Sequence, residues 1–220
     1  MKLTLSVSYK VQSKRIVTLT SEPLALKDVK SLLPELKKQK TIIRIDMEDE
    51  FGSLWSEKEL NKYLERLNEE PHEVTLYFDG GYDKSHKIAG LGTVIYFIKN
   101  NKRYRKRVNR QLDLIQDNNE AEFAALYFAI QQLEIIGVHQ QSIQIQGDSM
   151  QVIHQMNDEW PVTNDAFHYW IDKIEHLLKK LGIRATYELL PRNNNKQADK
   201  LATQALAGEE IDAIYEIENE

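Results

Sequence analysis

The sequence predicts an α/β protein: a mixed five-stranded sheet with helices on both faces, plus a small N-terminal α+β domain. Residues 72–208 show three strands in succession and then alternating helices and strands, a pattern typical of a sheet with antiparallel and parallel pairs. Pro71 separates this region from a shorter pattern of strands and helices. With 220 residues, 41% of them hydrophobic, the chain is large enough to bury both cores.

Residues 1–70 are expected to form a compact β-β-α-β-α domain. Paired strands are indicated by the alternating segments LTLSVSY and IVTLT, and a helix by LALKDVKSLLPELKK. A further strand is predicted at TIIRIDM, and a capped helix at SEKELNKYLERL. The 13 basic and 12 acidic residues of this domain nearly cancel, so they give no electrostatic sign of a nucleic-acid partner. The domain's own partner stays unknown.

Residues 72–208 are expected to carry the functional domain. Strands are predicted from apolar alternation, as in VTLYF, and helices from apolar residues three or four apart. The predicted strands are 74–79, 91–98, 103–110, 142–147 and 183–189, and the predicted helices are 119–136, 149–156, 165–181 and 195–207.

The net charge of −5 hides a strong segregation of charge along the chain. Residues 209–220, EEIDAIYEIENE, hold six acids and no base, so residues 1–208 alone carry +1. We expect this acidic tail to be a solvated, frayed end. Residues 99–110, KNNKRYRKRVNR, hold seven bases and no acid. In the strand predicted there, Arg103, Arg105 and Arg107 either bind phosphates or protect an edge strand by their charge.

Two absences limit the classes of function. The chain has no Cys, which excludes disulfides and thiolate zinc sites and suits a reducing compartment. It has no run of eighteen apolar residues and no secretory leader, so we expect neither a membrane span nor export. A cytoplasmic location is therefore expected.

Two carboxylates are predicted at the start of the functional domain. Asp79 ends the strand VTLYFD on the face opposite its apolar residues, and Gly80 and Gly81 leave space beside it. Taken alone, Asp-Gly-Gly is also a common turn. Glu122 lies four residues before Leu126, on the buried stripe of its helix, where an anion is costly unless a cation or several donors meet it. Its alternative role is helix capping.

Two more carboxylates follow. Asp148 lies where the strand SIQIQ passes into a helix, at the carboxyl end of a strand, where α/β sheets bind ligands; such an Asp is also a good N-cap. Asp199 borders the apolar stripe of the last helix, as an ordinary boundary residue would. If the four acids converge, they repel one another unless hard cations lie between them. Oxygen ligands suit two Mg²⁺ ions, or Mn²⁺, an arrangement known in phosphoryl hydrolysis.

Four segments, YFDGG, NNEAEFAAL, QGDSMQVI and RNNNKQADKLATQAL, resemble in order and spacing the four motifs of the type 1 ribonuclease H family. The resemblance covers about 137 of the 220 residues. It implies a ribonuclease H-like fold in which Asp79, Glu122, Asp148 and Asp199 are the catalytic, metal-binding tetrad. By their place in the motifs, substrate contacts are expected at Gly80, Gly81, Asn119, Ser149 and Asn195.

The implied activity is endonucleolytic hydrolysis of the RNA strand of RNA/DNA hybrids, which the family distinguishes by their 2′-hydroxyls. Three departures keep alternatives open. Met150 stands where the family often has Gln, the loop PRNNNKQA lacks a His that some branches use, and no basic helical handle is present. The alternatives are a nucleic-acid or protein-binding module with little cleavage, and a metal-dependent nuclease on another RNA.

Overall fold

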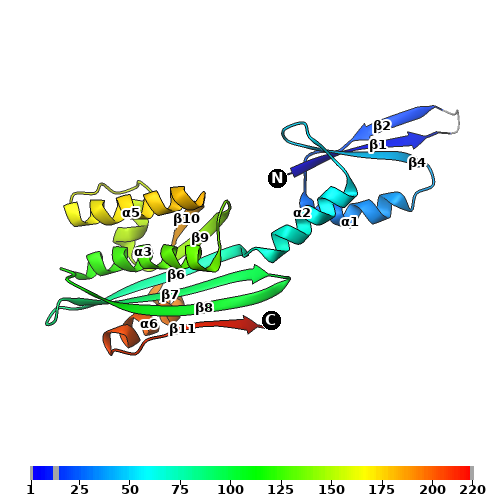
Figure 1. Ribbon diagram of the computed structural model, residues 1–220. Coiled ribbons are helices and arrows are strands. Elements are labelled where there is room, and N and C mark those ends of the chain that lie inside the picture. Colours follow the sequence, from blue (N-terminus) through cyan, green and yellow to red (C-terminus); the bar gives the residue numbers. More distant parts are fainter. Residues whose placement is uncertain (1, 12–14, 219–220) are drawn as a thin grey trace. The chain divides into compact units, whose positions relative to one another are not determined.

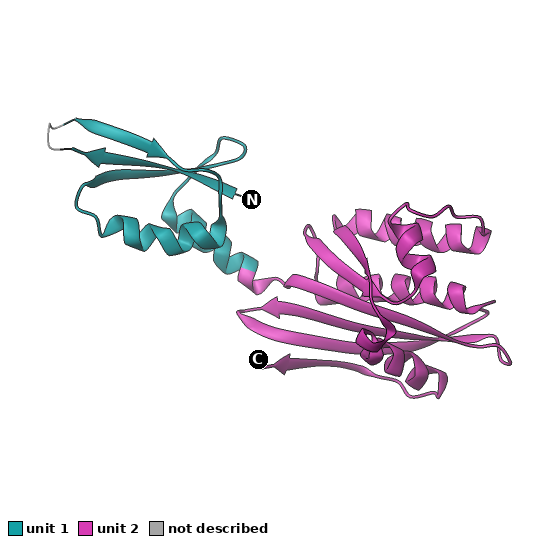
Figure 2. Ribbon diagram, turned by 180° about the vertical axis from the view of Figure 1, so that it is seen from behind, with its two compact units in different colours: residues 1–67 teal, residues 68–220 magenta. Residues whose placement is uncertain are grey.

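The computed structural model describes residues 2–11 and 15–218, which form two compact units (Figures 1 and 2). The first unit covers Met1–Leu67 and the second Asn68–Glu220. The division falls near the end of helix α2 (Glu57–Glu69), next to the boundary expected at residues 69–73. No helix in the described ranges is long and apolar enough to cross a membrane.

The first unit is an antiparallel sheet with two helices. The strands β1 (Lys2–Lys10), β2 (Ile16–Thr20), β4 (Ile42–Asp49) and β5 (Leu54–Trp55) lie in the order β2-β1-β4-β5, and β3 (Leu24–Ala25) pairs with β1. Leu5 and Met47 of the sheet share a core with Leu33 of α1 (Leu26–Lys37) and Leu60 of α2. The expected cap of α2 is present: Glu59 Oε2 accepts from the Ser56 N–H at 2.8 Å, and Ser56 Oγ accepts from the Glu59 N–H at 3.2 Å.

The second unit is built on a six-stranded mixed sheet in the order β10-β9-β6-β7-β8-β11. Its strands are β6 (His72–Asp83), β7 (Ile88–Lys99), β8 (Lys102–Asp113), β9 (Ser142–Gly147), β10 (Arg184–Leu189) and β11 (Asp212–Ile217). The strand β9 runs parallel to both of its neighbours, and the other pairs are antiparallel. The mixed sheet predicted from the sequence is therefore confirmed, with one strand more than expected.

Helices cover both faces of this sheet, as predicted. The helices are α3 (Asn118–Ile136), α4 (Met150–Met156), α5 (Asp165–Leu181) and α6 (Lys196–Leu206), with a short 3-10 turn, η1 (Arg192–Asn194), before α6. Figure 1 shows α3 and α5 on one side of the sheet and α6 on the other. Helix α6 lies very close to β7, because a Cβ atom at Gly90 or Gly92 would overlap carbonyl oxygens of Ala202 and Ala198.

Strand β6 does not end at Asp79, so both the predicted strand end and the alternative turn are wrong. The strand continues to Asp83, with Gly80 paired to Leu91 and Gly81 to Gly90. Both glycines lie under helices: a side chain at Gly80 would overlap α3, and one at Gly81 would press on Leu206 of α6. Close packing, and not a turn, therefore accounts for the glycine pair.

The acidic tail is not frayed over Asp212–Ile217, which corrects the expectation of a solvated end. These residues form β11, an antiparallel partner of the basic strand β8. Lys106 is buried and pairs with Asp212, and Lys102 Nζ lies 2.8 Å from Glu216 Oε2. Opposite charges thus meet across the pair, a favourable cross-strand arrangement. Because β11 covers β8, the interpretation of the basic segment as an edge strand is wrong.

Candidate active site

The candidate site lies where β9 stops beside β6. The strand β9 pairs with β6 only over Thr75–Tyr77 and ends at Gly147, so the next part of β6 has a free edge on that side. Asp79 lies on this part, paired on its other side with Gly92 of β7. Its side chain is 8% exposed. The end of β9 therefore opens a small gap in the sheet beside a nearly buried carboxylate.

Glu122 reaches the same gap from α3. Its Oε2 accepts a hydrogen bond from the Gly80 N–H at 3.1 Å, and the residue is 8% exposed. Helix capping is done by other residues: Asp117 Oδ1 accepts from the Glu120 N–H at 2.8 Å, and Glu120 Oε2 accepts from the Gln116 N–H at 2.8 Å. The capping interpretation of Glu122 is therefore wrong, and its burial agrees with the stripe predicted from the sequence.

Gly80 sets how closely α3 approaches β6. An added Cβ would overlap the carbonyl of Ala121, which is backbone and has no flexible end to move away. We expect Gly80→Ala to lower the free energy of unfolding by about 2–4 kcal/mol, within the range of severe overpacking. Gly81→Ala is the matched control, because its Cβ would meet only the end of the Leu206 side chain, at 3.1 Å. Urea denaturation of both variants measures the difference, and equal losses would contradict the assigned role of Gly80.

Asp148 directly follows β9. Because Gln146 pairs with Tyr77 in the parallel pair of β9 and β6, Asp148 lies at the same register as Asp79. Its Oδ1 accepts a hydrogen bond from Asn195 Nδ2 at 2.6 Å, and its Oδ2 lies 3.5 Å from Arg192 Nε. The N-cap of α4 is Ser149, whose Oγ accepts from the Val152 N–H at 3.5 Å. The capping interpretation of Asp148 is therefore wrong, and its carboxylate is held by polar groups from the segment before α6.

Asp199 belongs to the first turn of α6 and is exposed, as a residue at the border of an amphipathic helix would be. Its carboxylate is near enough to Asp79 to raise the pKa of that group. The structure therefore brings together acids from β6, α3, α6 and the end of β9. These are the four acids that the sequence motifs single out.

Burial and mutual repulsion raise the pKa values of the two inner carboxyls. The pKa of Asp79 rises to about 7, first because of burial, then because of the charges of Asp148 and Asp199 and a hydrogen bond with Asp148. The pKa of Glu122 is raised well above its usual value by burial and by the charges of Asp79 and Asp148. The positive charge of Arg192 opposes both shifts, but its effect on each pKa is smaller than that of burial or of the neighbouring carboxylates. The cluster is thus short of positive charge.

The donor set fits hard divalent cations, because it consists of carboxylate oxygens and the chain has no Cys. As the side chains stand, no three His, Cys, Asp or Glu residues in the described ranges form a ready-made ion site. Metal binding at this cluster therefore requires the carboxylates to turn toward a shared ion. The raised pKa values show a site where a cation would relieve repulsion.

The residues expected to contact substrate lie in different surroundings. Asn119 is exposed on the first turn of α3, three residues before Glu122, whereas Ser149 caps α4, and Gly80 and Gly81 serve packing. Asn195 lies at the centre, donating to Asp148 and to the Phe78 carbonyl.

The three arginines of the basic strand β8 also lie in different surroundings. Arg103 and Arg105 line a pocket beside Asn195, and Arg107 is not among its lining residues. The sequence interpretation did not single out Arg192, although it stands in the quoted segment PRNNNKQA. Nor did it single out Tyr77, Tyr96 and Gln197, because their proximity follows from strand register and not from any local pattern.

Comparisons with known proteins agree on the fold of the second unit. Residues 77–205 match the family described as Reverse transcriptase-like. The chain is 40% identical over 190 residues to Uncharacterized protein YpeP of Bacillus subtilis (strain 168), covering 86% of this chain and 84% of that protein.

Solved structures of ribonucleases H superpose on about three fifths of the chain. The RNase H1 of the halophilic archaeon Halobacterium salinarum NRC-1 matches with a TM-score of 0.52 and 24% identity, over 61% of this chain and 98% of that one. LC11-RNase H1 in complex with an RNA/DNA hybrid, an enzyme isolated from compost by a metagenomic approach, matches with a TM-score of 0.54 and 22% identity, over 61% and 97%. These likenesses establish the fold.

Proposed function

The chain belongs to the reverse transcriptase-like family, its second unit is a ribonuclease H-like domain, and on this basis we propose that it is a metal-dependent endoribonuclease. Its proposed reaction is hydrolysis of the RNA strand of RNA/DNA hybrids with two Mg²⁺ or Mn²⁺ ions. The proposed catalytic and metal-binding residues are Asp79, Glu122, Asp148 and Asp199.

One observation carries this proposal: carboxylates from four separate elements lie near the gap beside β6, and burial and neighbouring charges raise the pKa values of the two inner ones, Asp79 and Glu122. A protein that needed only stability would gain by replacing such a buried, repelling group with a neutral one. Retention of all four acids is expected where cations are bound for chemistry. A pair of divalent ions, when bound, would assist deprotonation of the attacking water and stabilise the departing oxygen.

The chain's own residues would hold this site in shape. The Gly80 N–H orients Glu122, and Asn195 Nδ2 orients Asp148 while its second hydrogen bond, to the Phe78 carbonyl, ties it to β6. Arg192, 92% exposed, lies at the outer side of Asp148, where it favours the approach of a phosphate. Asn119, exposed near Glu122, is placed to contact the RNA strand.

The proposed substrate is supported by two lines of reasoning. LC11-RNase H1, which shares the fold, is solved in complex with an RNA/DNA hybrid. The quoted motifs resemble those of enzymes that act on such hybrids, whose RNA strand a protein recognises through its 2′-hydroxyls. The absence of a basic handle from the sequence predicts weak substrate affinity and a shallow salt dependence, because few phosphates are contacted.

The purified full chain, incubated with end-labelled RNA/DNA hybrid, single-stranded RNA and double-stranded RNA in Mg²⁺ or Mn²⁺, tests this function. We expect cleavage of the RNA in the hybrid alone, lost in EDTA. Cleavage of single-stranded or double-stranded RNA instead would identify a metal-dependent nuclease on another substrate. Binding of the hybrid without cleavage in either metal would identify a binding module and overturn the proposed activity.

A further inference from the structure

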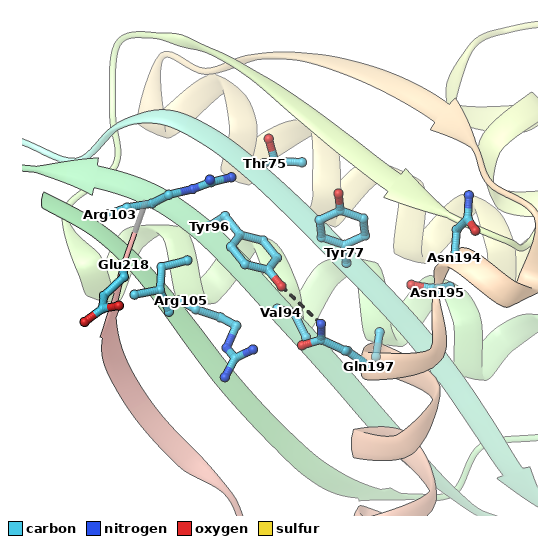
Figure 3. Close-up of a pocket in the computed structure, with 12 residues that line it drawn as sticks. Thr75, Tyr77, Val94, Tyr96, Arg103, Arg105, Asn194, Asn195, Gln197 and Glu218 are labelled. Atoms are coloured by element: carbon cyan, nitrogen blue, oxygen red, sulfur yellow. Dashed lines mark hydrogen bonds between the residues drawn. The ribbon is translucent and has the colours of Figure 1, made fainter. Parts of the chain in front are cut away.

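A pocket of about 550 Å³ lies beside the carboxylates, on the sheet face that α6 covers only in part (Figure 3). Tyr77 and Tyr96 project from β6 and β7 into it, and Arg103 and Arg105 reach it from β8. Asn195 lines the pocket and also donates to Asp148, so this residue links the pocket to the candidate active site. Its volume lies within the roughly 300–1,000 Å³ of small-molecule sites.

The lining of the pocket carries net positive charge, with Arg103 and Arg105 against one carboxylate. Within the described ranges, neither Arg103 nor Arg105 has a carboxylate at ion-pair distance, although other basic residues of the same strand do. The Nε of Arg105 is buried and has no hydrogen-bond partner among the described residues. A carboxylate, Glu218, also lines the pocket but is exposed to solvent. Two guanidinium groups that line the same pocket are suited to binding a phosphate.

Asn195 adds a buried acceptor on the side nearest the carboxylates. The residue is 2% exposed, and its two Nδ2 hydrogen bonds fix which end of the amide is which. Its Oδ1 then has no partner among the described residues, and Figure 3 shows the amide at the edge of the pocket. A buried acceptor without a partner is costly, so it calls for a donor from a ligand.

Two further features favour a ligand that joins a phosphate to an aromatic base. The eleven-residue helix α6 begins at the pocket with no side-chain cap, so the positive end of its dipole faces the space. The rings of Tyr77 and Tyr96 lie 5.8 Å apart at 83°, and the Tyr96 hydroxyl accepts from Gln197 Nε2 at 3.2 Å. Such rings provide surfaces on which a base can stack.

We infer that this pocket binds one nucleotide unit. Arg103 and Arg105 hold its phosphate, and Asn195 Oδ1 accepts from a sugar hydroxyl or a base N–H. The unit comes either from a free nucleotide or from a strand that runs past the carboxylates. Only the second source rests on the proposed function.

Nuclear magnetic resonance of the full ¹⁵N-labelled chain in EDTA tests the pocket without any cleavage. We expect 5′-AMP to shift the amide signals of Tyr96 and Gln197 in a saturable manner, and adenosine to bind at least fivefold more weakly. The variant Arg103→Gln/Arg105→Gln should bind 5′-AMP at least tenfold more weakly. Arg184→Gln, which removes one positive charge from an exposed site on β10, should stay within twofold of the native chain.

Equal binding of adenosine and 5′-AMP by the native chain would overturn the inference, and this comparison does not depend on the folding of any variant. Absence of saturable shifts at the pocket, or unchanged affinity in the double arginine variant, would also overturn it. Hybrids with and without a single-stranded RNA overhang distinguish the sources: tighter binding of the overhang, competed by 5′-AMP, supports the strand, and equal binding supports a free nucleotide. If the chain cuts no hybrid but binds 5′-AMP at the pocket, the proposed function fails and the inference of a nucleotide pocket still holds.

Discussion

Replacement of Asp79 by Asn is expected to lower the rate of hybrid hydrolysis about 10³-fold or more. The change keeps the shape of the side chain but removes the charge at the centre of the four carboxylates, next to Asp148 and Asp199. Loss of one anionic ligand from a metal site removes several kcal/mol of stabilisation of the transition state, and about 4 kcal/mol corresponds to a 10³-fold lower rate. The initial rate of cleavage of labelled hybrid in saturating Mg²⁺ measures the effect.

The matched control for this experiment is Asp172→Asn. Asp172 is exposed on α5, so the same chemical change there should leave the rate within twofold. Equal rates for Asp79→Asn and the native chain would contradict the assignment of the tetrad. A lower rate caused by unfolding of Asp79→Asn would not support the tetrad either. The stability measurements that follow show whether the variant is folded.

The metal-free protein is expected to lose stability as the pH rises from about 4 to 7. Asp79 has a pKa of about 7 in the folded chain, against an ordinary value of 3.8, so the folded state holds a proton that the unfolded state has released. The stability that Asp79 contributes is therefore fully present below its pKa in the unfolded chain. It is lost as the pH rises through its pKa in the folded chain. Glu122 acts in the same direction, because its pKa is also raised. Urea denaturation in EDTA at several pH values measures this slope.

Asp79→Asn should remove a large part of that slope. At pH 8 the variant is expected to be more stable than the native chain by about 1–3 kcal/mol, since a shift of one pKa unit corresponds to about 1.4 kcal/mol. At pH 4, where the carboxyl is protonated in the folded chain, the two proteins should be similar. Asp172→Asn should follow the native chain at every pH. If Asp79→Asn were less stable than the native chain at pH 8, repulsion among these carboxylates would not be what destabilises the native chain.

Local patterns pointed to Asp79, Glu122 and Asp148, whereas Asp199 was added only by the resemblance to the ribonuclease H motifs. The register of the apolar stripe in α3 placed Glu122 on a buried face, and the end of β9 placed Asp148 where sheets bind ligands. Alternation in β6 gave the correct face for Asp79 but the wrong position in the strand. The reason is that Gly80 and Gly81 have the composition of a turn, while their function in packing depends on α3 and α6, which are distant in sequence.

Other features depend on contacts between distant segments and were not predictable from local patterns. Strand β11 exists because an acidic segment pairs with the basic strand β8, about one hundred residues earlier. The contacts of Asp148 with Arg192 and Asn195 likewise need the segment before α6 to fold back on the sheet. The pocket at Tyr77 and Tyr96 requires the register of β6 with β7 and the point at which α6 begins.

The most direct measurement of metal binding by the four acids is the melting temperature at pH 8 during a titration with Mg²⁺ or Mn²⁺. A cation that binds the folded chain alone stabilises it by mass action, and here it also relieves the repulsion around Asp79. The melting temperature of the native chain should rise with metal concentration and return in EDTA, whereas Asp79→Asn should start higher and respond little. A native chain that shows no rise, or a variant that shows the same rise, would contradict a metal site at these residues.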